Sequence, residues 1–219
     1  MLAARAPRVR LIDALHEAPD FAIEPAAHLL AALAAQFPRR SVFLSVVDPG
    51  VGGSRDAIVV RADGRIFVGP DNGLLSIVWR RARRRGCARI AWRPTRLSAS
   101  FHGRDLFAPV AAELASGRAP RGWLVPQQKP GVLLDPRDLA QVIYVDHYGN
   151  ALTGLRAAAV PKHAVLRAGG RRLRYARSFA EAKGIFWYPN SIGLVEIASP
   201  AGSAARALRL RPGSRIAWV

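Results

Sequence analysis

The sequence has few cysteines and no long apolar run, and both shortages exclude a class of protein. A single cysteine, Cys87, excludes an intrachain disulfide framework and a zinc site built from cysteine pairs, and it favours a reducing compartment. No run approaches the ~18 apolar residues of a membrane span. The N-terminus alternates Ala with Arg where a signal peptide is continuously apolar. We therefore expect a cytoplasmic protein that does not bind a membrane.

Acidic residues and lysine are also scarce. The 219 residues include 33 Lys and Arg against 15 Asp and Glu, a formal charge of +18, and only Lys129, Lys162 and Lys183 are lysine. Such a charge favours nucleic-acid binding, but the arginines are scattered through an Ala-, Gly- and Pro-rich chain, as a GC-rich genome produces. The dense run at residues 80–85 fits either the solvent face of a helix or a phosphate-binding patch. Composition makes nucleic acid the less favoured partner.

The order of predicted elements indicates an α/β protein with two domains. Half of the residues are apolar, enough for a sizeable core. Residues 1–124 predict an N-terminal α/β catalytic domain around a central sheet, residues 125–138 a Pro- and Gly-punctuated linker, and residues 139–219 a smaller C-terminal β-barrel domain. The predicted strands are 9–12, 41–47, 58–61, 65–68, 89–92, 141–145, 164–167, 171–175, 193–198 and 215–219, and the predicted helices are 24–36, 74–85 and 105–115.

Three polar clusters interrupt the apolar scaffold. The first, residues 48–55, follows a predicted strand and runs from Asp48 through a glycine-rich turn to Arg55. Glycines let the backbone approach a ligand at such a strand end, but neither a phosphate-binding loop nor a dinucleotide fingerprint is present. The second cluster is residues 69–75, and the third is residues 100–109 around His102.

Each cluster has a purely structural interpretation when it is read alone. Asp71, Asn72 or Asp105 could simply cap the helix that follows it, and a lone histidine such as His102 is more often a packing residue than a catalyst. In combination, Asp48, Arg55 and His102 could position and polarise a water molecule, because arginine favours hydroxide while histidine and aspartate accept or relay its proton.

With these clusters, the sequence resembles the S-adenosylmethionine hydroxide adenosyltransferases, the water-using relatives of the adenosylmethionine fluorinases and chlorinases. The similarity spans nearly the whole chain, and six ordered motifs are more specific than any one of them. These motifs are residues 47–52 with Arg55, residues 70–75, residues 101–105 with 107–109, residues 12–13 with 16–17, residues 144–150, and residues 190–198.

The resemblance implies both a fold and a reaction. The family has an N-terminal α/β domain and a C-terminal β-barrel, and forms homotrimers whose active sites lie between the N-domain of one subunit and the C-domain of its neighbour. Asp48, Arg55 and His102 match its water-activating triad. The implied reaction is attack of water or hydroxide on the ribose 5′-carbon of S-adenosylmethionine, which releases adenosine and L-methionine without metal or organic cofactor.

The resemblance also implies substrate contacts. Phe21 matches an aromatic near the ribose, Asp146 and Ser191 match groups that hold the methionine end, and Asn150 and Phe179 match adenine contacts. Asn72 and Gly103 are further expected substrate-binding residues. From the residues alone, Phe21 and Phe179 could be core and Asn150 could be a turn residue. Since S-adenosylmethionine is a cation, we expect the pocket to be locally acidic, with the positive charge outside it.

The sequence departs from the family at two places. Gly154 stands where the family usually has Asn. The opening strand with Thr-Asp-Phe-Gly, whose Asp clasps the ribose hydroxyls, is absent, and residues 1–7 read as the tail of the helix that should follow it. We expect that the native start lies roughly 20 residues upstream, enough for a strand and most of a helix, and that the chain as given has weak or no activity.

Three other functions remain open from the sequence. A halide-using adenosyltransferase is one, although those relatives carry aromatics at the positions of Asp48 and His102 and serine at Gly103. The others are an inactive module that binds adenosine or S-adenosylmethionine, and an Arg-rich RNA-binding protein.

Overall fold

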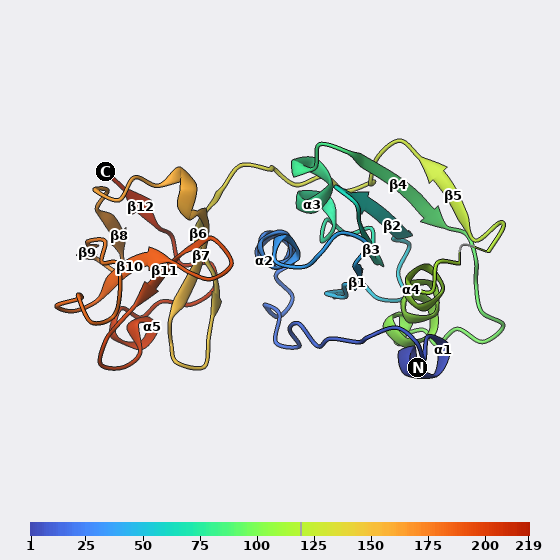
Figure 1. The fold of residues 1–219 in the computed structure, drawn as a ribbon, viewed down its shortest axis with the longest axis horizontal. Coiled ribbons are helices and arrows are strands. Elements are labelled where there is room, and N and C mark those ends of the chain that lie inside the picture. Colours follow the sequence, from blue (N-terminus) through green and yellow to red (C-terminus); the bar gives the residue numbers. More distant parts are fainter. Residues whose placement is uncertain (119) are drawn as a thin grey trace. The chain divides into compact units, whose positions relative to one another are not determined.

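A computed structural model describes residues 1–118 and 120–219, and the chain divides into two compact units (Figure 1). The N-terminal unit comprises Met1–Ala27 and Phe37–Pro136, and the C-terminal unit comprises His28–Gln36 and Arg137–Val219. The boundary after Pro136 falls inside the segment predicted as a linker. The first boundary passes through helix α2 (Ile23–Ala35), whose predicted range was 24–36.

The N-terminal unit is built on a five-stranded sheet with the order β1-β3-β2-β4-β5. Strand β1 runs parallel to β3, and the other neighbours are antiparallel. The strands are β1 (Val42–Leu44), β2 (Ala57–Ala62), β3 (Arg65–Pro70), β4 (Arg85–Ile90) and β5 (Leu124–Gln127). Strand β5 therefore uses the first residues of the predicted linker.

The predicted hairpin is present as β2 and β3. Ala62 pairs with Arg65, so Asp63 and Gly64 form a two-residue connection. Both have positive φ, 46° and 84°, the backbone conformation that matches the twist of a tight hairpin.

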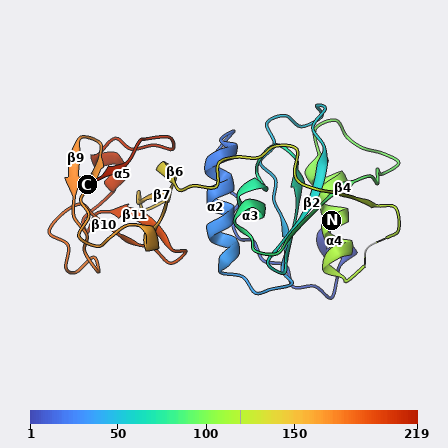
Figure 2. The same cartoon turned by 90° about the horizontal axis from the view of Figure 1, so that it is seen from above.

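Helices cover both faces of this sheet. Helix α4 (Ala108–Ala115) packs on β1 and β3, and α3 (Ser76–Arg81) packs on β2, on opposite sides of the sheet in Figures 1 and 2. Val59 and Val68 belong to the apolar cluster under the helix at residues 103–115. Because side chains alternate along a strand, the equally buried Ile58 and Val60 serve the other face.

Three predicted elements of this unit differ from the structure. The helix predicted at residues 74–85 ends at Arg81, because the Asp63 carboxylate accepts the backbone N–H groups of Arg83 (3.1 Å) and Arg84 (2.9 Å) and the chain joins the sheet as β4. The predicted strand at residues 9–12 is irregular. The strand predicted at residues 41–47 is the short edge strand β1, only half buried.

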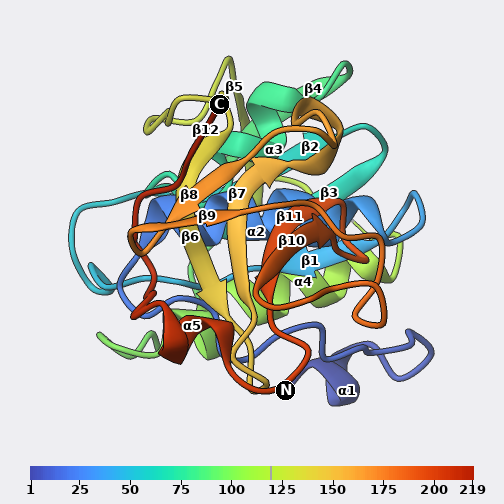
Figure 3. The same cartoon turned by 90° about the vertical axis from the view of Figure 1, so that its left-hand side faces the viewer.

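The C-terminal unit consists mainly of two antiparallel sheets (Figure 3). The four-stranded sheet has the order β10-β11-β7-β6, and the three-stranded sheet has the order β12-β8-β9. The strands are β6 (Leu139–Val145), β7 (Ala151–Arg156), β8 (Leu166–Ala168), β9 (Arg171–Leu173), β10 (Phe186–Pro189), β11 (Leu194–Ala198) and β12 (Ala217–Trp218). Two short helices, α1 (Leu2–Arg5) in the N-terminal unit and α5 (Ala204–Ala207) here, complete the α-helices of the described residues.

The prediction of a β-barrel needs a correction. The described residues of this unit form two sheets that continuous strand pairing does not close into one barrel. Isolated bridges join the sheet edges, Gln141 with Arg215 at one edge and Tyr175 with Trp187 at the other. The fold class is otherwise confirmed: the protein is a mixed α/β structure with a sheet-rich C-terminal unit.

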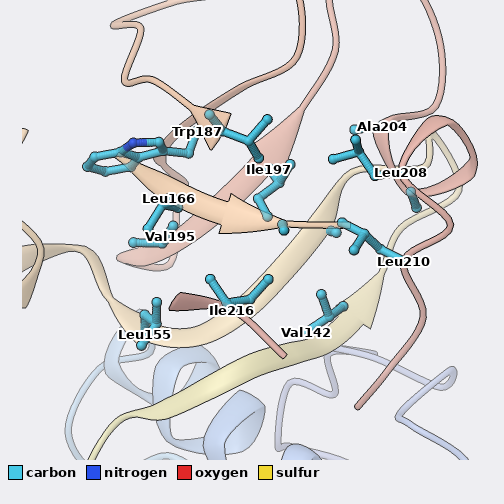
Figure 4. Packing of buried hydrophobic residues seen from close by; sticks show 14 of the residues in the cluster. Val142, Leu155, Leu166, Trp187, Val195, Ile197, Ala204, Leu208, Leu210 and Ile216 are labelled. Atoms are coloured by element: carbon cyan, nitrogen blue, oxygen red, sulfur yellow. The ribbon is translucent and has the colours of Figure 1, made fainter. Parts of the chain in front are cut away.

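A single apolar core fills the space between these two sheets (Figure 4). Trp187 is 1% exposed, and its indole N–H donates to the carbonyl of Ala164 (3.2 Å), so the one polar atom of this large side chain is satisfied. No helix in the described part of the chain is long and apolar enough to cross a membrane.

Candidate active site

The loop after β1 carries two of the three predicted catalytic residues. Asn72 fixes this loop, because its Nδ2 donates to the carbonyl of Val47 (2.8 Å) while its Oδ1 accepts the backbone N–H of Leu74 (3.2 Å). Gly52 has φ +82°, and a Cβ there would lie 2.6 Å from the carbonyl oxygen of Ala99. Glycine is therefore needed where this loop passes under the segment that leads to His102.

Asp48, Arg55 and His102 meet in the N-terminal unit. The Arg55 guanidinium forms a two-point contact with the Asp48 carboxylate, with Nε 3.0 Å from Oδ1 and Nη2 on Oδ2. The same Nη2 lies 3.0 Å from Nδ1 of His102. The side chains of Asp48 and Arg55 are only 4% and 12% exposed. Arg55 therefore bridges the other two members of the triad in a site largely shielded from solvent.

This geometry assigns a protonation state to His102. A guanidinium only donates hydrogen bonds, so Nδ1 of His102 must accept and the proton of the neutral ring lies on Nε2. Burial first, and then the charge of Arg55, lower the pKa of His102 below its usual value, with Asp48 acting in the opposite direction. The imidazole is consequently neutral at pH 7.

A π-helical turn places His102 against this pair. The turn spans Gly103–Phe107 and passes directly into α4, so the helix begins before the predicted residue 105. Such turns are frequent at functional sites. The ring of Phe107 lies under Arg55, with the guanidinium carbon 5.2 Å from the ring centroid. Gly103 faces Val46, where a Cβ would make ordinary contact at 3.7 Å.

Two acidic residues of the motifs hold chain segments in place. The Asp71 carboxylate, in a residue only 8% exposed, accepts the backbone N–H of Gly131 (2.8 Å). The Asp105 carboxylate accepts the backbone N–H of Ser98 (3.1 Å) and pairs with Arg104. The hydrogen bond from Arg104, and after it the one from Ser98, lowers the pKa of Asp105. Neither aspartate caps its own helix. Asp71 instead ties the 131–132 segment to the end of β3.

Four of the predicted substrate-binding residues line one pocket in the C-terminal unit. It has a volume of about 740 Å³. Asp146 and Asn150 are linked, since the carboxylate accepts both the backbone N–H (2.8 Å) and Nδ2 (2.9 Å) of Asn150. Phe179 is 42% exposed and meets Phe186 edge-on at 5.2 Å. The lining comprises Asp146, Tyr148, Asn150, Phe179, Tyr188, Asn190, Ser191, Glu196, Ser199, Pro200 and Gly202.

The charge of this pocket is opposite to that of the chain. Its lining holds two carboxylates, Asp146 and Glu196, and no lysine or arginine, in a protein of formal charge +18. A pocket with this lining favours a cationic ligand. Tyr188, Asn190 and Glu196 are further functional candidates. The motif at residues 190–198 contains two of them, but no local signal in the sequence separates them from ordinary strand residues.

Phe21 lies outside both the triad and the pocket, and Gly154 has no room for a larger side chain. Phe21 is 82% exposed with φ +56° and contributes to neither the triad nor the lining of the pocket. A Cβ on Gly154 would lie 2.6 Å from both Cβ and the carbonyl oxygen of Leu139 on the adjacent strand. Leu139 thus occupies the space that an asparagine at position 154 would need.

Three arginines of the run at residues 80–85 contact their own chain through their side chains. Arg80 donates to the carbonyl of Leu134 (2.8 Å), and Arg81 donates to the carbonyl of Pro136 (2.9 Å). The guanidinium of Arg85 lies 4.1 Å from the ring centroid of Trp79.

Among the described residues, no group of three or more His, Cys, Asp or Glu side chains could hold a metal ion.

The fold and the triad define a mixed α/β protein of two units with a polar cluster suited to holding water. Comparison with protein families gives its class. The model described as the SAM hydroxide adenosyltransferase N-terminal domain matches residues 1–123, and the model of the C-terminal domain matches residues 140–217. The chain belongs to the SAM hydroxide adenosyltransferase family, as the motifs predicted.

Individual relatives agree with this assignment. A protein of Salinispora arenicola named (R)-S-adenosyl-L-methionine hydrolase is 39% identical to this chain, over 99% of this chain and 88% of the relative. A protein of Thermus thermophilus with the same name is 38% identical, over 97% of this chain and 89% of the relative. A crystal structure of an uncharacterized conserved protein from Thermotoga maritima has a TM-score of 0.88 at 31% identity, covering 99% of this chain and 91% of that chain. The crystal structure of a conserved hypothetical protein from Thermus thermophilus has a TM-score of 0.79 at 34% identity, over 100% and 91%.

Proposed function

We propose that this protein hydrolyses S-adenosyl-L-methionine to adenosine and L-methionine. Family membership and the names of the relatives support this activity. The observation that carries the chemistry is the Arg55 guanidinium, which joins the Asp48 carboxylate to the His102 imidazole in a shielded site. Such a triad presents charged and hydrogen-bonding groups to one small polar nucleophile.

The proposed step is a displacement at the ribose 5′-carbon. The oxygen of a water molecule bonds to C5′ while the C5′–S bond breaks and its electron pair returns to sulfur. The water gives up one proton, which passes through the triad to solvent. Because the sulfonium leaves as a neutral thioether, the leaving group needs no acid, so the triad acts only on the water. Holding the nucleophile in line and excluding bulk water supply the acceleration.

In this proposal the substrate-binding residues keep their predicted roles. Asp146 and Ser191 hold the methionine end and Asn150 and Phe179 contact adenine, supported by their convergence on one pocket without basic side chains. Asn72 acts through the loop that it fixes at Val47, with Gly103 beside His102. Phe21 is proposed to face the ribose from its exposed position.

Chromatography of the products from S-adenosyl-L-methionine tests the activity. Taking adenosine formation by the unaltered protein as the reference, we expect its loss in His102→Ala and no loss in His163→Ala, which removes an exposed histidine of the C-terminal unit. Adenosine formation that survives His102→Ala would refute the role of the triad. Because the relatives are named for the (R) epimer, both sulfonium epimers are assayed separately. Added chloride or fluoride that yields halogenated adenosine would favour the halide-using alternative.

We further propose that the protein acts in the cytoplasm as a homotrimer, with each active site formed by the triad of one copy and the pocket of a neighbouring copy. Light scattering should then give three times the 23.7 kDa chain mass. Asp48→Asn and Ser191→Ala should each be inactive, and co-expressing the two should restore adenosine formation, because some interfaces then combine an intact triad with an intact pocket. If co-expression restores nothing, each site is built within one copy.

A further inference from the structure

Glu196 is a buried carboxylate to which neither the family resemblance nor the triad assigns a role. It lies on β11 and is 6% exposed. Burying a carboxylate is costly unless hydrogen bonds compensate for its lost hydration. Here Oε1 accepts the hydroxyl of Tyr188 (2.7 Å) and Oε2 accepts Nδ2 of Asn190 (3.1 Å). Both oxygens therefore accept from a neutral donor, and neither of these two donors is a cation.

Both donors belong to the wall of the C-terminal pocket. Tyr188 pairs with Glu196 across the β10–β11 register, and its ring lies 5.7 Å from that of Phe179. Burial and the hydrogen bond to Glu196 raise the pKa of Tyr188 above its usual value, so its hydroxyl remains a donor. The carboxylate thus orients an aromatic side chain that supports the proposed adenine contact.

Asn190 links Glu196 to the turn that carries Ser191. Its Oδ1 accepts the backbone N–H groups of Ile192 (3.1 Å) and Leu194 (2.9 Å). With Oδ1 committed to these two groups, only Nδ2 is available to Glu196. The carboxylate therefore fixes which way the Asn190 amide points, and the amide fixes the shape of the turn at residues 190–194.

We propose that Glu196 is a positioning and specificity-determining residue that holds the Ser191 turn and supplies the second negative charge that selects a cationic substrate. This rests on the proposed function. The substrate carries a positive sulfonium and a positive ammonium group, and Glu196 and Asp146 line the pocket without a basic neighbour in its lining. Adenosine carries neither cation, so its binding should depend on the pocket's shape and not on this charge.

Glu196→Gln tests the proposal because it keeps the size of the side chain and removes the charge. The glutamine amide also presents a donor to Tyr188 and Asn190, both of which already donate. We expect KM for S-adenosyl-L-methionine to rise about tenfold, equivalent to about 1.4 kcal/mol, with kcat within about threefold of the unaltered protein. Adenosine affinity, measured by calorimetry, should change less than about threefold. Tyr188→Phe is the matched control, since it removes one hydrogen bond but keeps the charge, and it should raise KM less than Glu196→Gln does.

The possible results separate the role of Glu196 from the proposed hydrolysis. Equal loss of adenosine and S-adenosyl-L-methionine affinity in Glu196→Gln, or an unchanged KM, would overturn the specificity role. Glu196→Asp, which retains the charge, should recover part of the affinity for the cation, and failure to do so also counts against it. If the unaltered protein binds S-adenosyl-L-methionine but forms no adenosine, the proposed function fails while the calorimetric comparison still tests Glu196.

Discussion

Replacing Arg55 with lysine tests whether the triad depends on the shape of the guanidinium or only on its charge. The guanidinium contacts both Asp48 oxygens and, through Nη2, the Nδ1 of His102. A single ammonium group cannot span these three acceptors, because it is a point charge without the planar fork of arginine. Lysine would keep the positive charge and lose at least one of the charge-assisted contacts.

The expected magnitude follows from burial. The Asp48 side chain is 4% exposed, so water replaces a lost donor poorly. A hydrogen bond to a charged group contributes about 1.5–3 kcal/mol, and each 1.36 kcal/mol of barrier is about tenfold in rate. We therefore expect Arg55→Lys to lower kcat for adenosine formation by roughly 10- to 100-fold.

The control is a similar pair with no role in the site. Arg118 also contacts a carboxylate at two points, with Nε 2.6 Å and Nη2 3.3 Å from Glu113, but its side chain is 57% exposed. Arg118→Lys should leave kcat unchanged, because exposed ion pairs contribute little. A rate for Arg55→Lys within about threefold of the unaltered protein would refute the argument, since charge alone would then suffice.

Three further predictions concern pH and backbone packing. Burial and the charge of Arg55 lower the pKa of His102, and the neutral ring is the form that accepts a hydrogen bond from Arg55. A pH profile of kcat/KM should therefore show activity retained at neutral pH and lost only as the pH falls below 6.5, the usual pKa of histidine. Loss of activity at or above pH 6.5 would contradict this. Gly52→Ala should lower the urea-unfolding free energy by more than about 1 kcal/mol, since φ is +82° and the new Cβ meets a carbonyl, whereas Gly50→Ala, with open space around it, should be nearly neutral. Gly154→Ala should likewise lower the thermal midpoint, because the Cβ would overlap Leu139; an unchanged midpoint would show that β6 shifts freely.

Local patterns predicted the hairpin and the helices of the N-terminal unit in part. The connection at Asp63–Gly64 was predictable because two residues with positive φ have few sequence solutions. The end of α3 was not, because it depends on Asp63 binding the backbone of Arg83 and Arg84 about 20 residues further along the chain. Propensity alone cannot register such a contact.

In the C-terminal unit, too, local patterns predicted part of the structure and contacts between distant segments decided the rest. Alternating short strands predicted a sheet-rich domain, and five predicted strands correspond to β6, β8, β9, β11 and β12. Strands β7 and β10 were missed, and so was the arrangement as two sheets joined by isolated bridges. Pairing between distant segments decides that arrangement, and a strand's own residues carry little information about its partner.

The sequence by itself determined the family and the excess of arginine, and it predicted which three residues form the triad, because ordered motifs and composition are properties of the chain. Tertiary structure decided which of these residues lie together. Only folding shows that Arg55 joins Asp48 to His102, that three arginines of the run at residues 80–85 contact their own chain, and that the acidic pocket of the C-terminal unit has no basic side chain in its lining. The physical reason is that charge and hydrogen bonding act over a few ångströms in space, a distance that sequence separation does not measure.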